Sequence, residues 1–167
     1  EEQTASPLPN IIVSHFDYGG ASVAAGDKFN LSFRFKNTSR SISAENMVVT
    51  VDAGEGLMMN GSSNTFFFNK IKPGKSKTVS LPMKTLKTVT DSSPVVSLNF
   101  KYEYLDHKKR TSATTDIKLS VPVYQPDRFE ITKPVVPESV TAGEEVTLTL
   151  NYVNKSKTEI ANLTADV

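Results

Sequence analysis

A phrase near the start of the chain, SVAAGDKFNLSFRFKNTS at residues 22–39, returns as SVTAGEEVTLTLNYVNKS at residues 139–156. Over the 23 aligned positions that begin at Ser22 and Ser139, eight residues are identical at a constant spacing of 117. The identities include a Gly that bends the backbone before a strand and an Asn whose side chain bonds the turning backbone after it. Because one β-sandwich has about this length, the repeat predicts a tandem array of sandwiches.

Alternation of apolar and polar residues marks the strands of the first repeat. In KFNLSFRF, residues 28–35, every second residue is apolar, and the same period of two recurs in residues 95–104 and 116–123. One-sided strands of this kind belong to antiparallel sheets with one wet face. We expect the core to be built from their inward positions, among them Leu31, Phe33, Phe35, Val79, Leu81, Leu98, Phe100, Leu119 and Val121.

Seven strands define the predicted fold, and turn signals separate them. We expect them near 10–17, 27–37, 44–52, 64–71, 76–84, 94–105 and 111–123. Two apolar faces that both need cover favour an all-β fold, an antiparallel immunoglobulin-like β-sandwich. The expected domains are a linker over 1–9, the sandwich over 10–124 and the opening part of a second, similar domain over 125–167. LKTV at 86–89 is expected to cross between the sheets as a short helical or irregular segment.

Composition excludes several classes of function. The chain has 167 residues, no cysteine and no tryptophan, with 19 Lys and Arg against 18 Asp and Glu. Without cysteine, disulfides, thiolate catalysis and cysteine-based zinc sites are excluded. A net charge of +1 predicts no long-range field for nucleic acid or acidic lipid, and no apolar run approaches the ~20 residues of a membrane span. We therefore expect no nucleic-acid partner and no membrane insertion in this segment.

A basic run, Lys108-Lys109-Arg110, either contacts an anionic wall polymer or forms the solvated tip of a hairpin.

An ordered set of short motifs resembles a known family. The motifs are Ala25-Gly26-Asp27 before a strand, Asn37-Thr38 at its end, Ala44-Glu45-Asn46-Met47 opening another strand, and the turn Pro73-Gly74-Lys75-Ser76. In this order they resemble the CARDB-like, S-layer-associated immunoglobulin-like domains of bacterial surface proteins. The resemblance covers nearly all of residues 10–123, and the opening third of the pattern recurs after residue 127.

This resemblance implies a location and a mode of use. Domains of that family lie in larger exported proteins at the extracellular, cell-wall or cell-surface side, and they serve as spacers or in adhesion and assembly. They share no catalytic residues. We therefore expect a non-catalytic spacer, adhesion or interaction module of an exported bacterial cell-surface protein, without a cofactor, whose partner is an unknown protein or a wall polysaccharide. The alternative is a carbohydrate-binding accessory module of a larger secreted enzyme.

Two histidines are the candidates for catalysis, and neither is expected to act. His15 lies in the first strand, and His107 lies beside Asp106 at a hairpin tip. A Ser–His–Asp arrangement needs an ordered histidine flanked by an acid, and adjacent residues in a turn are expected to point apart. Calcium needs several closely spaced oxygen ligands, and TVDAGEG offers only Asp52 and Glu55. The sequence therefore predicts no enzyme and no catalytic, cofactor-binding or metal site.

Two apolar stretches supply a candidate contact surface. GLMMNG places Leu57, Met58 and Met59 in a glycine-bounded loop, where flexible Met side chains suit an adaptable contact or plug one end of the sandwich. In TFFFNKI, alternation turns Phe67 outward. Sugar-binding sandwiches stack rings on exposed aromatic side chains. A single Phe is a thin platform, and we expect a neighbouring loop to cover it.

The second repeat is expected to need strands from elsewhere. Residues 127–167 number 41 against a repeat of 117, so they hold only the opening strands of a sandwich. Val146, Leu148, Leu150 and Tyr152 would then lack a core, and two strand edges would lack partners. We expect another copy of the chain to supply strands or apolar surface, which means self-association through 127–167.

Overall fold

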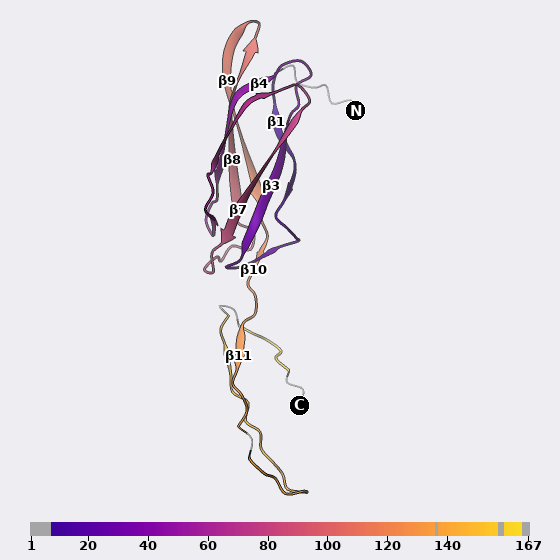
Figure 1. Ribbon diagram of the computed structural model, residues 1–167, viewed down its shortest axis with the longest axis vertical. Helices are drawn as coiled ribbons and strands as arrows, with labels where there is room; N and C mark the ends of the chain where they lie inside the picture. Colours follow the sequence, from indigo (N-terminus) through magenta and orange to yellow (C-terminus); the bar gives the residue numbers. More distant parts are fainter. Residues whose placement is uncertain (1–7, 136, 157–158, 165–167) are drawn as a thin grey trace. The chain divides into compact units, whose positions relative to one another are not determined.

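The computed structural model describes residues 8–135, 137–156 and 159–164 (Figure 1). The chain divides into two compact units, Glu1–Tyr124 and Gln125–Val167. Of the linker expected over 1–9, residues 1–7 lie outside the described part.

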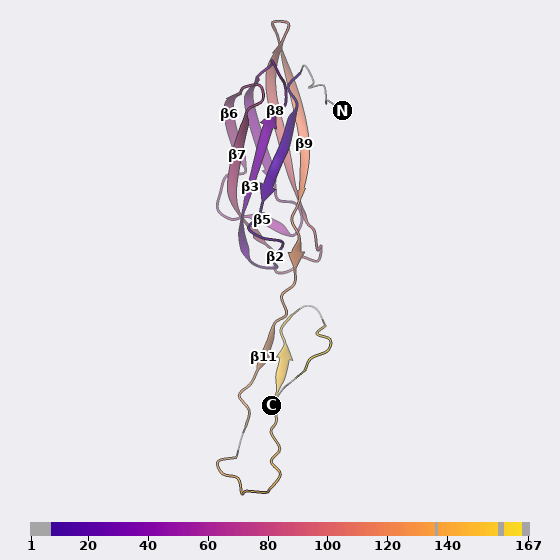
Figure 2. The ribbon, with the colours of Figure 1, turned by 90° about the vertical axis from the view of Figure 1, so that its right-hand side faces the viewer.

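Unit 1 is a sandwich of two four-stranded antiparallel sheets (Figures 1 and 2). The β3 sheet has the order β1 (Ile11–Asp17), β3 (Lys28–Asn37), β7 (Ser76–Thr85) and β5 (Leu57–Met59). The β8 sheet has the order β6 (Thr65–Ile71), β4 (Ala44–Asp52), β8 (Val95–Asp106) and β9 (Lys109–Ser120). The chain passes from the first sheet to the second after β3, β5 and β7, and it returns to the first sheet after β4 and β6. The fold is all-β and immunoglobulin-like, as expected.

The core lies between the inner faces of the two sheets. All nine core residues expected from the alternation are buried, and Phe33, Phe35 and Phe100 have no exposed surface. The Phe33 and Phe100 rings, one from each sheet, meet edge to face with centroids 6.4 Å apart. The alternation therefore assigned the strand faces correctly, because a shift of one residue would have exposed every one of these side chains.

The seven long strands begin and end within three residues of the expected positions. The last strand differs most. It begins at Lys109 because His107 and Lys108, with φ of 45° and 69°, close a two-residue turn of the kind that matches strand twist. It ends at Ser120, two residues before Pro122, which has no N–H to donate to the ladder.

Three short strands were not predicted. One is β5; the others, β2 (Val23–Ala24) and β10 (Val123–Tyr124), form a parallel pair. The backbone N–H of Val23 donates to the Pro122 carbonyl over 2.9 Å, and that of Ala25 donates to the Tyr124 carbonyl over 2.9 Å. Strands of two or three residues show no period, so the sequence pattern cannot reveal them. Residues 86–89 do cross between the two sheets, and of the two forms expected, helical or irregular, the segment is irregular, with a turn at 87–88.

The chain enters and leaves unit 1 at opposite ends. At the entry end, where β1 begins and β3 ends, the Thr38 N–H donates to the Asn10 carbonyl over 2.9 Å. At the exit end, β10 pairs with β2, just before β3 begins. The ten residues of β3 separate the two ends by roughly 33 Å at ~3.3 Å per residue.

Unit 2 is a two-stranded antiparallel ribbon. It consists of β11 (Phe129–Ile131) and β12 (Tyr152–Asn154), with an isolated bridge between Val135 and Thr149 farther along. Among the described residues of unit 2, no second sheet covers the apolar face of this ribbon.

Candidate functional site

The four residues expected to form a contact surface do not form one patch. Leu57, Met58 and Met59 form the edge strand β5, which pairs with β7, so the expected loop is wrong. Leu57 is buried in the core, whereas Met58 is exposed on the outer face of the β3 sheet. Phe67 lies on the outer face of the β8 sheet. Since the inner faces of the two sheets meet, Met58 and Phe67 point to opposite sides of the sandwich.

Phe67 is the aromatic residue of this set that reaches solvent. Its neighbours Phe66 and Phe68 pack against the core, as the alternation predicted. Phe67 itself is 64% exposed, so the expectation that a loop covers it is wrong. A single ring offers one stacking contact, and Phe67 lines none of the three pockets described for unit 1.

The two histidines lie on different parts of unit 1. His15 is exposed in β1, at the register shift opposite Arg34. His107 Nδ1 contacts Asp106 Oδ1 at 2.6 Å, so the expectation that these turn neighbours point apart is wrong. The His107 side chain is 95% exposed, which leaves this pair in water and outside any enclosed site.

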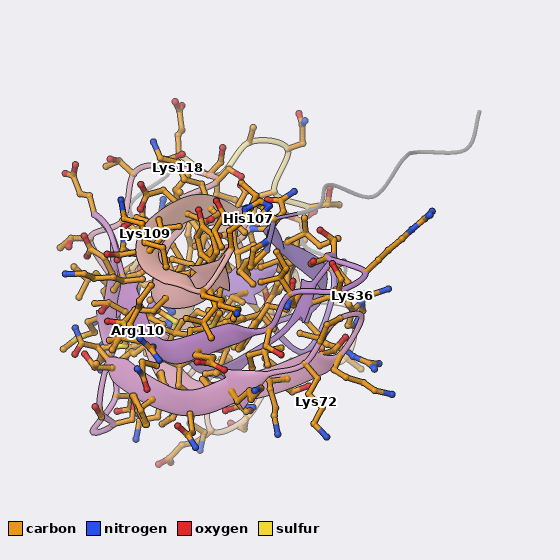
Figure 3. All side chains as sticks on the ribbon, turned by 90° about the horizontal axis from the view of Figure 1, so that it is seen from above. Lys36, Lys72, His107, Lys109, Arg110 and Lys118 are labelled. Carbon is orange, nitrogen blue, oxygen red and sulfur yellow. The ribbon has the colours of Figure 1, made fainter. Side chains whose placement is uncertain are left out.

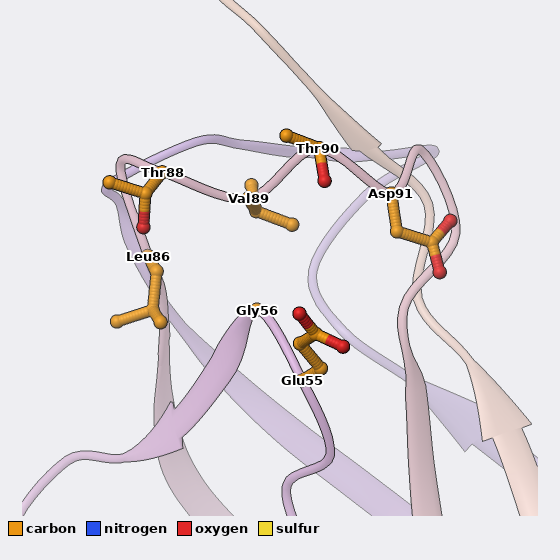
Figure 4. A pocket seen from close by; sticks show the side chains of 7 residues that line it. All are labelled: Glu55, Gly56, Leu86, Thr88, Val89, Thr90 and Asp91. Carbon is orange, nitrogen blue, oxygen red and sulfur yellow. The ribbon is translucent and has the colours of Figure 1, made fainter.

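A small pocket of about 180 Å³ opens at the exit end (Figure 4). Its lining comes from the turn before β5 and from the crossing between β7 and β8; the residues are Glu55, Gly56, Leu86, Thr88, Val89, Thr90 and Asp91.

The acidic residues Asp52 and Glu55 were expected to be too few to bind calcium. In the structure, the Asp52 carboxylate accepts a hydrogen bond from the Gly54 N–H over 3.2 Å. Within the described ranges, no group of three or more His, Cys, Asp or Glu residues is arranged to hold a metal ion.

A charged network spans all four strands of the β8 sheet near the entry end. Glu45 binds Lys70 over 2.9 Å, and Arg110 binds Glu103 over 2.7 Å. Asn46, at a φ of 47° where β4 bulges, donates to the same Glu103 carboxylate over 2.9 Å. The hydrogen bond from Lys70 lowers the pKa of Glu45, and those from Asn46 and then Arg110 lower the pKa of Glu103.

The ribbon of unit 2 has the pairing of the first ribbon of unit 1. In unit 1, β1 pairs with the end of β3 so that Ile11 faces Asn37. In unit 2, Phe129 faces Asn154, the residue 117 positions after Asn37, and the next two pairs follow in the same order. The link between β11 and the repeated phrase is one residue shorter than the link between β1 and that phrase. Residues of β11 therefore lie 118 positions after their equivalents in β1, and residues of β12 lie 117 positions after theirs in β3.

The irregularity of the first ribbon is also reproduced. In unit 1 the register shifts by one residue after Val13, and Asp17 then faces Ser32. In unit 2 the bridge joins Val135 to Thr149, which are the equivalents of Asp17 and Ser32 under the same offsets. A one-residue shift therefore falls between equivalent residue pairs in both ribbons, and a bulge of this kind bends its strand.

A side chain holds the bulge in both ribbons. The Ser14 hydroxyl donates to the Arg34 carbonyl over 3.1 Å. Its equivalent, the Thr132 hydroxyl, donates to the Asn151 carbonyl over 3.1 Å. A hydroxyl therefore supplies the same donor at the two equivalent positions, although the residue is Ser in one ribbon and Thr in the other.

The two ribbons differ in what covers their apolar face. In unit 1 the second sheet buries it, and Ile11, Leu31, Phe33 and Phe35 are 0–1% exposed. The equivalent side chains of unit 2 are open to solvent: Phe129 is 48%, Leu148 47%, Leu150 43% and Tyr152 61% exposed. We call this row of side chains the ribbon face.

Comparisons with known proteins do not assign a family. No family model matches the chain, and no curated protein matches it. Solved structures that match include Escherichia coli alpha-2-macroglobulin from domain MG7 to the C-terminus, at 15% identity and a TM-score of 0.49, covering 78% of this chain and 19% of that one. Salmonella alpha-2-macroglobulin reacted with methylamine matches at 15% identity and a TM-score of 0.48, covering 76% of this chain and 8% of that one.

The GAE domain of GGA2p from Saccharomyces cerevisiae matches at 16% identity and a TM-score of 0.34, covering 67% of this chain and 97% of that one. The chain thus spans a fifth or less of the macroglobulins. All these TM-scores lie below 0.5, so the fold assignment rests on the strand topology of the chain itself. In the described part of the chain, no helix is long and apolar enough to cross a membrane.

Proposed function

We propose that the chain is a non-catalytic spacer and interaction module of an exported bacterial cell-surface protein, built from sandwiches repeated in series. The observation that carries this proposal is the second ribbon, which repeats the register and the bulge bond of the first. A unit whose chain enters at one end and leaves at the other adds its own length to the protein with each repeat. For this sandwich that length is roughly 33 Å.

The proposed location depends on the family resemblance. The order of motifs from Ala25-Gly26-Asp27 to Pro73-Gly74-Lys75-Ser76 resembles CARDB-like, S-layer-associated domains. The structure supports this use of the motifs, because Gly26 has a φ of 89° and Gly74 a φ of 69°, values that favour glycine in the two turns. The proposed site of action is the extracellular face or the cell wall.

A carbohydrate-binding accessory module remains the second proposal. The observation that favours it is the 64% exposed ring of Phe67. Sugar sites generally combine an aromatic platform with convergent polar groups. Because Phe67 is a single exposed ring on the edge strand β6 and lines none of the pockets described, we favour the spacer.

We also propose that the ribbon face mediates self-association of the chain of 167 residues; in a protein with an intact second sandwich, the second sheet of that sandwich would cover this face instead. Four large apolar side chains in one row exceed the scattered apolar exposure of ordinary surfaces. Two copies of the same ribbon face are self-complementary about a two-fold axis.

Labelling of intact cells tests the proposed function. Antibodies raised against residues 8–124 should label intact cells of the source bacterium as strongly as lysed ones. Labelling that appears only after lysis contradicts export.

The protein should also turn over no ester, glycoside or peptide substrate; turnover that disappears in the His15→Gln/His107→Gln double variant overturns the non-catalytic role.

A further inference from the structure

Charge in unit 1 is separated between its two ends. The strand register allows the sandwich to be divided across the middle of its strands into an entry half and an exit half. The entry half consists of residues 8–14, 34–48, 67–78 and 101–114, and the exit half is the rest of residues 8–124.

The entry half carries a strong positive charge. It holds eleven basic and three acidic residues, a net charge of +8, whereas the exit half holds four basic and six acidic residues, a net charge of −2. The basic residues of the entry half are Arg34, Lys36, Arg40, Lys70, Lys72, Lys75, Lys77, Lys101, Lys108, Lys109 and Arg110. The chain total of +1 conceals this separation, so the absence of a field expected from composition does not hold for this half.

Internal pairing neutralises only part of this charge. Glu45 and Glu103 are held by Lys70 and Arg110, and Asp106 contacts His107. Because the entry half has three acidic residues against eleven basic ones, most of its basic residues have no acidic counterpart in that half. Cations crowded at one end repel each other, and a bound polyanion relieves that repulsion.

Seen from above, the labelled Lys36, Lys72, Lys109 and Arg110 project outward on different sides of unit 1 (Figure 3). At the β6–β7 turn, four lysines line a shallow cavity of about 300 Å³: Lys70, Lys72, Lys75 and Lys77, together with Ile71 and Ser76. Lys72, Lys75 and Lys77 are all exposed. Lys36 lies on the neighbouring strand, where it pairs with Ser76, so the cationic surface continues across the β3 sheet.

We propose that the entry half binds an extended anionic polymer of the cell envelope that carries phosphate or carboxylate groups along its chain. Eight of the eleven cations are lysines, whose flexible ammonium groups attract anions without demanding a fixed geometry. Such a surface suits a mobile polymer and releases its counterions on binding. Among the described residues of the entry half, Phe67 is the one exposed aromatic side chain, so successive nucleic-acid bases would find no stacking platform. The polymer's identity rests on the proposed export, because export places this surface beside it.

Binding of purified poly(ribitol phosphate) wall teichoic acid to the full chain tests this proposal. Affinity should be measurable at about 50 mM salt and should fall by at least about tenfold by about 200 mM, because the contacts are ionic. The triple variant Lys72→Glu/Lys75→Glu/Lys77→Glu should lose about tenfold or more at the lower salt. The matched control, Lys28→Glu/Lys84→Glu/Lys118→Glu in the exit half, changes the net charge equally and should lose less than about threefold.

The variant Lys72→Gln/Lys75→Gln/Lys77→Gln removes the three positive charges without adding negative ones. Its affinity for the polymer should lie between those of the wild type and the first triple variant, and its melting curve shows whether the fold is kept. Equal losses in the two Glu triples, no binding at low salt, or salt-independent binding would each overturn the proposal. Equal or tighter binding of single-stranded poly(dT) would assign the surface to nucleic acid instead. Surface labelling of cells together with failure to bind the polymer leaves the proposed function standing and removes this inference.

Discussion

Gly26 and Gly143 lie 117 residues apart and have the same backbone φ of 89°. Each sits in the same turn: the Asp27 N–H donates to the Ala24 carbonyl over 3.1 Å, and the Glu144 N–H donates to that of Thr141 over 3.2 Å. Because a φ of 89° is accessible to glycine and costly for other residues, the sequence identity at this position has a backbone cause. The repeated phrase therefore encodes a repeated turn as well as a repeated strand.

Leu98→Ala should destabilise unit 1 by about 2–5 kcal/mol, because it leaves a cavity in a filled core. Leu98 is 1% exposed and points between the sheets. Lys101→Ala, an exposed position on the same strand, should change stability by less than about 0.5 kcal/mol. Urea unfolding measures both, and equal effects would mean that the strand faces are assigned wrongly.

Asn37→Ala should cost unit 1 about 2 kcal/mol or more, since buried polar groups left without partners cost about 1–3 kcal/mol each. The fully buried Asn37 amide donates to the Ile42 and Ile71 carbonyls over 2.9 and 3.1 Å, and its oxygen accepts the Ser39 N–H over 3.1 Å. Asn154→Ala, at the equivalent position in unit 2, should leave the unfolding of unit 1 unchanged. A similar loss from both variants would contradict this role of Asn37.

The carboxyl of Glu45 should titrate below its ordinary value of 4.5, and Lys70→Met should raise that pKa by removing the hydrogen bond from Lys70. A pKa lowered in the folded state contributes stability that is fully present above about 4.5 and is lost as the pH falls through the lowered value. Carbon-detected NMR of the side-chain carboxyls measures it. Glu103, held by Asn46 and Arg110, is the internal control and should keep its pKa in this variant.

Leu150→Asp should abolish self-association if the ribbon face is the contact. Light scattering of the full chain should show a mass that rises above the monomer with concentration, because exposed apolar rows associate. Asn151→Asp adds the same charge one residue on, where alternation turns the side chain to the opposite face, and should associate like the wild type. A monomer at every concentration, or equal effects of the two variants, would refute self-association through this face.

Much of unit 1 follows from the sequence because its long strands alternate strictly. Phe33 and Leu98 are assigned to the core by position alone, and the structure buries both. The two-residue strands β2 and β10 carry no such period, and their parallel pairing joins residues 100 positions apart. Met58 reads as a loop residue between glycines, yet it belongs to a strand because β7 offers an unpaired edge beside it.

The charge of the entry half is hidden from the sequence for a different reason. Lys36, Lys75 and Lys109 are scattered along the chain, and only the strand pairing brings them to one end of the sandwich. Counting charges over the whole chain averages this end with the acidic residues elsewhere. The bulge bond of Thr132 is equally invisible, because a hydroxyl near a strand end predicts no particular partner.

Cross-strand nuclear Overhauser contacts in residues 128–155 test most directly whether unit 2 rebuilds the first ribbon of unit 1. The repeat predicts contacts between Ile131 and Tyr152 and, after the one-residue shift, between Val135 and Thr149. These should match the contacts of Val13 with Phe35 and of Asp17 with Ser32 in the same spectrum. Contacts of Val135 with Leu148, the pairing without the shift, or no cross-strand contacts in this region would contradict the tandem repeat on which the proposed function depends.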